Sequence, residues 1–438
     1  MFHKNYLIAL LCIMSYSFQS AAQAKWTVMV YMAANNDLDI FAIENIKQMM
    51  RIGSNEQLNL IIFLAQEHHA SRENYAKIIK IEKDHQLLIK TINNSKLADS
   101  GDPKTLIQFC NNTIAQFPAD HYALIFWNHG TGPLDPSTGR TLTVSEIFEF
   151  DYSLPESPLY LPLFSNFEIV DKKSIQKGVC FDEATGNFLK ERDLDFALKM
   201  ICKQGLNNNK LDLIGFDTCL MAMVEVMYIA KNYAHLMVAS QEVERGTGWN
   251  YKKALSLFET KAPTPLEFAK HIVNAYAKTY HFANDYTLSC LDLSVAQKLE
   301  SNIKELAFLL HKGLSNNPET VAQLLRKSRY SHHCIHFDEP DYIDLDNFLR
   351  NLLRNVAHVA LLNSPENSSF KKRISEVLAE GLELIKTMVV ANKVGSLFDK
   401  AKGVSIYFPE HVLHKSYKKS QFSIYTDWLT VIQQFLAI

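Results

Sequence analysis

The chain has 438 residues, of which 47% are hydrophobic and 21% charged, a composition typical of a globular protein long enough for two domains. Its formal net charge is −2 and no block of Lys and Arg forms a basic face, so we expect no nucleic-acid partner. With 15 glycines, the sequence also gives no sign of a glycine-rich phosphate-binding loop.

The N-terminal segment has the features of a signal peptide. Lys4 precedes an apolar run over residues 6–14, and the segment ends in the small-x-small pattern of residues 22–24. The apolar run is about half of the ~20 residues that a membrane span requires, and no later segment has the length and apolar purity of a membrane helix. We therefore expect residues 1–24 to be removed and the mature chain, which has no membrane span, to be secreted or periplasmic.

Five apolar runs of strand length predict a mostly parallel sheet. They are apolar on both faces, as expected for strands that lie between two layers of helices. Helical patterns alternate with them, which is typical of an α/β doubly wound arrangement. The runs are residues 26–34, 58–65, 121–127, 211–216 and 236–240, and the helical patterns are residues 40–50, 105–117, 189–202 and 220–232.

Two other regions differ in character. Residues 133–178 contain five prolines and no sustained period, which predicts an exposed insertion. A short strand and turn are predicted directly after it, over residues 178–186. Residues 255–438 are mainly helical with one late strand at residues 403–408, and we expect them to form a C-terminal accessory domain beside an α/β domain of residues 25–254.

Two reactive side chains follow strands of the predicted sheet, at the edge where open parallel sheets bind ligands. His129 lies two residues past the third strand, and Cys219 follows the fourth strand directly before a predicted helix. The helix N-terminus would favour the thiolate, which is the attacking form of cysteine. Each residue alone is more often structural, but together at adjacent strand ends they predict a thiol–imidazole site.

Neighbouring residues fit such a site. The backbone N–H groups of Gly130 and Cys219 could hold the oxyanion of a tetrahedral intermediate. Asp217 has two interpretations: an ordinary helix N-cap, or a carboxylate at the base of a substrate pocket that pairs with an Arg or Lys side chain.

The other cysteines form no metal or redox motif, because no CxxC pair is present. Six of the seven remain after signal-peptide removal, and they cannot all pair if Cys219 is a nucleophile. Cys110, Cys202 and Cys290 lie among apolar residues and are predicted to be buried thiols. The histidine-rich segment at residues 331–336 lacks the i, i+4 spacing of two helical ligands, so a loop is preferred over a metal site.

Seven segments resemble the clostripain family of cysteine peptidases, and they occur in family order over nearly the whole mature chain. They are WTVMVYMAANNDLD, FWNHGTG, GVCFDEATG, LIGFDTCLMAMVEV, VASQEVERGTGWNY, YIDLDNF and GVSIYFP. The resemblance implies a caspase-like α/β fold and a dyad formed by His129, in the family's Asn-His-Gly motif, and Cys219, in its Asp-x-Cys motif. It also implies cleavage after Arg or Lys, with Asp217 matching the acidic residue that selects a basic P1 side chain, the residue before the scissile bond.

Two further expectations come from the resemblance. Family members are often activated by self-cleavage between the histidine and the cysteine, which here is the insertion at residues 133–178. The candidate cut sites are Arg140, Lys172, Lys173 and Lys177. Relatives commonly carry two acidic residues after the Ala-Ser of the fifth strand; here Gln241 replaces the first and Glu242 keeps the second. Glu242 is therefore a candidate substrate-binding residue, and the preference for a basic P1 residue is expected to be weaker or shifted.

The sequence thus predicts a secreted cysteine endopeptidase that acts on protein or peptide substrates by acyl transfer. The Cys219 thiolate attacks the peptide carbonyl, and His129 protonates the leaving amine and later activates water. No cofactor is expected: some relatives depend on calcium, but this sequence contains no EF-hand loop or comparable cluster of oxygen ligands. Two alternatives remain open, a non-catalytic secreted binding protein on the same fold and a related transpeptidase that passes the acyl group to an amine.

Overall fold

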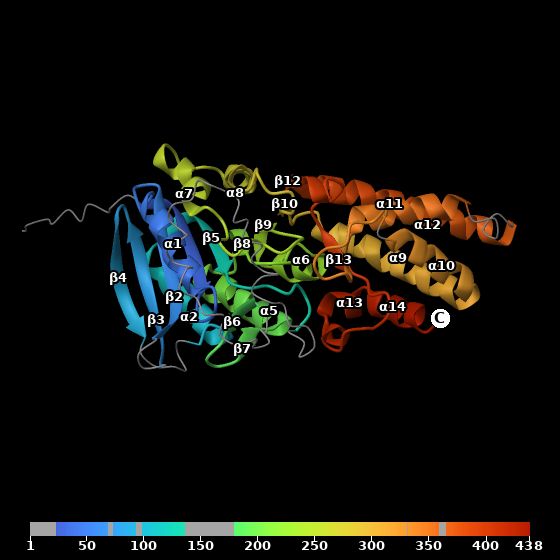
Figure 1. Ribbon diagram of the computed structural model, residues 1–438, viewed down its shortest axis with the longest axis horizontal. Helices are drawn as coiled ribbons and strands as arrows, with labels where there is room; N and C mark the ends of the chain where they lie inside the picture. Colours follow the sequence, from blue (N-terminus) through green and yellow to red (C-terminus); the bar gives the residue numbers. More distant parts are fainter. Residues whose placement is uncertain (1–22, 69–72, 93–98, 136–178, 331, 359–364) are drawn as a thin grey trace, which may run out of the picture.

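The centre of the molecule is a nine-stranded sheet (Figure 1). The structure is a computed structural model that describes residues 23–68, 73–92, 99–135, 179–330, 332–358 and 365–438. The strands of the sheet are Ala24–Ala33 (β1), Leu58–His68 (β2), Glu73–Glu82 (β3), His85–Ile92 (β4), Ala119–Trp127 (β5), Leu211–Asp217 (β8), Ala234–Ala239 (β9), Thr287–Asp292 (β10) and Val389–Val394 (β12). Their order across the sheet is β12-β10-β9-β8-β5-β1-β2-β3-β4.

The five central strands are parallel, which confirms the predicted mostly parallel sheet. They are the strands that the apolar runs predict, and in β1 every residue except Lys25 is buried. The outer strands run antiparallel to their neighbours, and no apolar run predicts them. The outer strands lack a continuous apolar run for two reasons. Strand β4 is largely exposed, and the buried strand β10 carries the hydrogen-bonded hydroxyl groups of Thr287 and Ser289.

Helices cover both faces of the sheet, and side chains that alternate along β1 enter two separate cores. Val28 and Val30 belong to the core of one face, and Met29 and Tyr31 to the core of the other. The helices on the first face are Asp39–Met50 (α1), Tyr251–Ala254 (α7) and Pro265–Thr279 (α8), and those on the second are Pro103–Gln116 (α2), Glu191–Met200 (α5) and Val224–Ala230 (α6). The predicted α/β arrangement, with strands buried between two helical layers, is thus confirmed.

The C-terminal part is mainly helical, as predicted, and its helices lie at one end of the molecule (Figure 1). Its helices are Ala296–Asn316 (α9), Pro318–Arg329 (α10), Leu345–His358 (α11), Pro365–Met388 (α12), Gln421–Tyr425 (α13) and Trp428–Leu436 (α14). In the part of the chain that the structure describes, no helix combines the length and the apolar character that crossing a membrane requires.

Two small sheets accompany the main one. Val179–Asp182 (β6) and Asn187–Leu189 (β7) form the short strand and turn predicted after the insertion. Ser405–Tyr407 (β13), the predicted late strand, pairs with Tyr342–Asp344 (β11). Strands β10 and β12 lie in the predicted C-terminal domain but belong to the main sheet, so residues on both sides of position 254 share one sheet. The division into two domains stays a prediction.

Candidate active site

A pocket lies at the carboxyl ends of β5 and β8, the edge where the sequence predicts a site. Its lining includes both members of the predicted dyad, His129 from the loop after β5 and Cys219 from the loop after β8. Asp217 and Glu244 line the same pocket, Glu244 from the loop that follows β9. The parallel register of β5 and β8, in which Trp127 lies opposite Asp217, brings these loops together.

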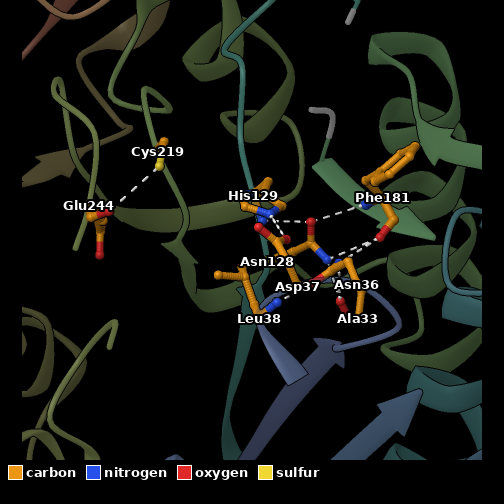
Figure 2. A network of polar contacts seen from close by, with 9 residues as sticks. All are labelled: Ala33, Asn36, Asp37, Leu38, Asn128, His129, Phe181, Cys219 and Glu244. Atoms are coloured by element: carbon orange, nitrogen blue, oxygen red, sulfur yellow. Dashed lines mark hydrogen bonds and ion pairs between the residues drawn. The ribbon is translucent and has the colours of Figure 1, made fainter. Parts of the chain in front are cut away.

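The histidine loop is held by the side chain of Asn128 (Figure 2). The amide oxygen of Asn128 accepts hydrogen bonds from the backbone N–H of His129 at 2.6 Å and from that of Phe181 in β6 at 3.1 Å. Its amide nitrogen donates to the carbonyl groups of Ala33, at the end of β1, and Phe181. One side chain therefore joins the histidine loop to β1 and to the strand that follows the insertion. His129 itself is buried, with Nε2 at 2.6 Å from Oδ1 of Asp37.

The segment after Cys219 is not helical as predicted, because α6 begins at Val224 rather than at residue 220. Leu220 has a φ of 62°, in the left-handed region, and its N–H donates to the carbonyl of Glu242. The N–H and carbonyl of Ala222 bond to Ser240 and Ser405. These tertiary hydrogen bonds take the backbone groups that a helical turn would use. The predicted stabilisation of a Cys219 thiolate by a helix N-terminus is therefore wrong, and so is the N-cap interpretation of Asp217.

Cys219 is buried, and its Sγ lies 3.8 Å from the backbone carbonyl oxygen of Glu244, toward which it points in Figure 2. The loop that carries Cys219 touches the histidine loop at Gly130. A Cβ atom added to Gly130 would lie 2.2 Å from the carbonyl oxygen of Cys219, closer than real Cβ contacts allow. The two predicted catalytic loops thus meet at a position where only glycine fits. That the N–H groups of Gly130 and Cys219 hold an oxyanion stays a prediction.

Two buried carboxylates lie together in the pocket. Asp217 accepts a hydrogen bond from the backbone N–H of Trp249 at 2.9 Å and one from the hydroxyl of Tyr251 at 2.8 Å. Burial raises the pKa of Asp217 to about 7. Burial, and then the neighbouring charge of Asp217, also raise the pKa of Glu244. Asp217 therefore gains its negative charge only as the pH rises through the neutral range.

Glu242, the predicted second substrate-binding carboxylate, lies outside this pocket lining. Its carboxylate accepts hydrogen bonds from the backbone N–H groups of Val243 at 2.7 Å and Asp338 at 3.0 Å. Gln241 also points elsewhere, since its amide nitrogen donates to Asp344 at 3.0 Å. Glu244, which sequence reasoning missed, is the acidic side chain that this loop presents to the pocket. The sequence does not show which of Glu242 and Glu244 points into the pocket, because the irregular backbone of the loop sets the direction of each side chain.

The remaining predictions concern segments away from the pocket. The candidate cut sites Arg140, Lys172, Lys173 and Lys177 lie outside the described residues, as do residues 1–22 of the predicted signal peptide. None of the six described cysteines forms a disulfide and all are buried, which confirms the prediction for Cys110, Cys202 and Cys290. Over the described ranges, no three His, Cys, Asp or Glu side chains cluster as a metal site. Residues 332–336, the described part of the histidine-rich segment, lie in a loop in which His336 contacts the carbonyl groups of Pro340 and Arg329.

Comparison with known proteins shows a matching family model and a curated relative. The model of the clostripain family matches residues 30–162 and 164–434. Clostripain from Hathewaya histolytica is 24% identical over 252 residues, a match that covers 52% of this chain and 41% of that protein. The chain thus spans less than half the length of this curated relative.

Two solved structures have the same fold. A secreted C11 cysteine protease from Bacteroides thetaiotaomicron, in complex with an irreversible peptide inhibitor, superposes with a TM-score of 0.60 at 19% identity, covering 92% of this chain and 99% of that one. An inactive zymogen C11 protease from Parabacteroides distasonis gives a TM-score of 0.58 at 20% identity, covering 92% and 98%. At these identities the likeness shows the fold, and it agrees with the predicted fold class. Because the family model matches most of the 438-residue chain, the chain belongs to the clostripain family.

Proposed function

We propose that this chain is a secreted cysteine endopeptidase that hydrolyses peptide bonds through Cys219 and His129. The observation that carries the proposal is a single pocket lined by a thiol and an imidazole from the ends of adjacent parallel strands. The Cys219 thiolate attacks the peptide carbonyl, and His129 protonates the leaving amine and then activates a water molecule. The N–H groups of Gly130 and Cys219 hold the oxyanion of the tetrahedral intermediate.

We further propose that the pocket prefers Arg or Lys at P1. Asp217 and Glu244 are two buried acids in one pocket wall, and a cationic side chain that entered would compensate their charge. Arg245, the Arg or Lys side chain of the pocket lining, forms an ion pair with Asp285, so its charge is already compensated. Glu244 thus supplies the second carboxylate that the sequence pattern attributes to Glu242.

Cleavage of a peptide series that differs only at P1 tests this specificity. We expect Glu244→Gln to lower kcat/KM for Arg and Lys substrates by about 10- to 100-fold, the equivalent of the ~1.5–3 kcal/mol of a charged hydrogen bond, and to affect Leu substrates far less. Asp217→Asn is expected to act in the same direction. Glu242→Gln is the matched control, because Glu242 is a buried glutamate of the same loop that lies outside the pocket lining. An equal loss on every substrate would assign the two acids a structural role instead.

The same pair predicts a pH-dependent specificity. Burial raises the pKa of Asp217 to about 7, so below that pH the carboxyl is largely neutral and attracts a cation weakly. We expect the ratio of kcat/KM for Arg over Leu substrates to rise between about pH 5.5 and 8.5, the range that brackets this pKa. Titration of the dyad changes kcat/KM for both substrates and cancels in the ratio. The ratio therefore reports on the carboxylates of the pocket. In the Asp217→Asn, Glu244→Gln double variant the ratio should be flat, and a flat ratio in the wild type would contradict the assignment.

We also propose secretion after loss of residues 1–24, activation by self-cleavage within residues 133–178, and turnover without a metal cofactor. The support is the signal-like N-terminus, the basic residues of the insertion and the family to which the chain belongs. Intact-mass analysis of the purified protein, with sequencing of its N-termini, tests processing. Peptide turnover in excess chelator tests the metal requirement and should equal turnover in its absence.

A further inference from the structure

We propose that Asp37 is a positioning residue for His129, so that the dyad and its positioning residue come from the ends of three strands, β1, β5 and β8. The inference rests on the peptidase function proposed above and adds a residue to it. Oδ1 of Asp37 lies 2.6 Å from Nε2 of His129, and Figure 2 draws the contact between these two side chains. The side chain of His129 is 2% exposed and that of Asp37 is 27% exposed, so the protein shields most of this contact from water.

The contact selects the tautomer of the histidine. An ionised carboxylate has only acceptor atoms, so the hydrogen of this bond resides on Nε2 of His129. In the neutral ring the lone pair then resides on Nδ1, because one nitrogen donates and the other accepts. Asp37 therefore makes Nδ1 the basic nitrogen and fixes the plane of the ring. When the ring takes up a proton during the reaction, the adjacent carboxylate stabilises its positive charge.

The topology explains why residues so far apart in sequence meet. β1 lies beside β5 in parallel register, with Met32 opposite Trp127, so the loops that follow both strands leave the sheet at the same edge. Across the adjacent strands β1, β5 and β8 the order is therefore acid, base and nucleophile. The β1 loop is itself fixed: Nδ2 of Asn36 donates to the carbonyl of Phe181 at 2.9 Å, and Oδ1 of Asn36 accepts from the N–H of Leu38 at 3.0 Å.

The molecule contains a matched control for this contact. His121 and Asp212 form a second histidine–aspartate pair, 2.9 Å apart, near the opposite ends of the same strands β5 and β8 and away from the pocket. Asp37→Ala and Asp212→Ala each remove a carboxylate from a histidine. We expect Asp37→Ala to lower kcat by about 10²-fold, the scale of a positioned general base, with KM little changed because Asp37 is not part of the pocket lining. Asp212→Ala should leave kcat within about twofold.

A double-variant experiment separates positioning from general damage. The rate of alkylation of Cys219 by iodoacetamide, followed by mass spectrometry, reports thiolate formation without requiring turnover. In an otherwise wild-type protein, Asp37→Ala should slow this alkylation about tenfold. In a His129→Ala background it should cause no further slowing, since Asp37 acts through His129. Equal slowing in both backgrounds would overturn the proposal.

Asp37→Asn covers the case in which the alanine variant does not fold, because it preserves the size of the side chain. We expect at least about a tenfold loss of kcat, since an amide carries no charge and can favour the wrong tautomer. A folded Asp37→Asn enzyme with wild-type kcat would overturn the role of Asp37 alone. The proposed function fails separately, if the wild type neither cleaves peptides nor is alkylated at Cys219 faster than at its other buried cysteines.

Discussion

Replacing Cys219 with alanine is expected to abolish peptide cleavage while the protein remains folded. The covalent acyl-enzyme cannot form without Sγ, and losses of at least about 10⁴-fold are normal when a nucleophile is removed. The fold should survive because Cys219 forms no disulfide and only one buried sulfur atom is lost. The measurement is turnover of an Arg-containing reporter peptide, together with the thermal unfolding midpoint.

Cys202→Ala is the matched control for this experiment. Cys202 is 7% exposed against 6% for Cys219, and its sulfur also lies near a backbone carbonyl, that of Tyr233 at 3.5 Å. The control should retain full activity. If self-cleavage activates the protein, the Cys219→Ala variant should also remain a single uncut chain over residues 133–178. Unchanged turnover in Cys219→Ala would remove the proposed mechanism, and absence of labelling by a thiol-reactive probe in the wild type would favour a non-catalytic binding protein.

Gly130→Ala is expected to give the second-largest effect, a loss of about 10³-fold in kcat/KM. The added Cβ would lie 2.2 Å from the carbonyl oxygen of Cys219, so one of the two loops must move. Displacing a reacting group by about 1 Å costs about 10²-fold, and loss of an oxyanion donor costs a similar factor. The strain should also lower the free energy of unfolding by about 1–3 kcal/mol.

Gly186→Ala separates the catalytic from the general effect of adding a methyl group. Gly186 has a φ of 70° and nothing within 4 Å of an added Cβ, so its variant is strained in the backbone but displaces no neighbour. We expect it to lose about 1–2 kcal/mol of stability and to retain its activity. Urea unfolding and peptide turnover, measured on both variants, make the comparison. A Gly130→Ala enzyme that is destabilised but fully active would show that the contact between the two loops does not matter for catalysis.

Predictions from the sequence succeeded where a local pattern reports directly on burial. The central strands lie between two helical layers and must therefore be apolar on both faces. A continuous apolar run in the sequence is the pattern that this position produces, so the runs identify these strands. Strands β3 and β4 lack this signal because they lie toward the edge of the sheet, and β4 is largely exposed. The helix predicted to begin at residue 220 begins at Val224 for a different reason. Its first backbone groups bond to the loop after β9 and to β13, and such distant partners outweigh helical periodicity.

For the candidate site, the amino-acid sequence alone was sufficient to select the thiol and the imidazole that line the pocket, because each lies two residues past an apolar strand and so reaches the ligand-binding edge of the sheet. It also selected Asp217, which lines the pocket, but it was not sufficient to select Asp37 or Glu244. Asp37 meets His129 from 92 positions away because β1 lies beside β5, and strand order is a property of the assembled sheet. Glu244 enters the pocket, and Glu242 does not, because each side chain follows the backbone of an irregular loop whose hydrogen-bond partners lie in distant segments.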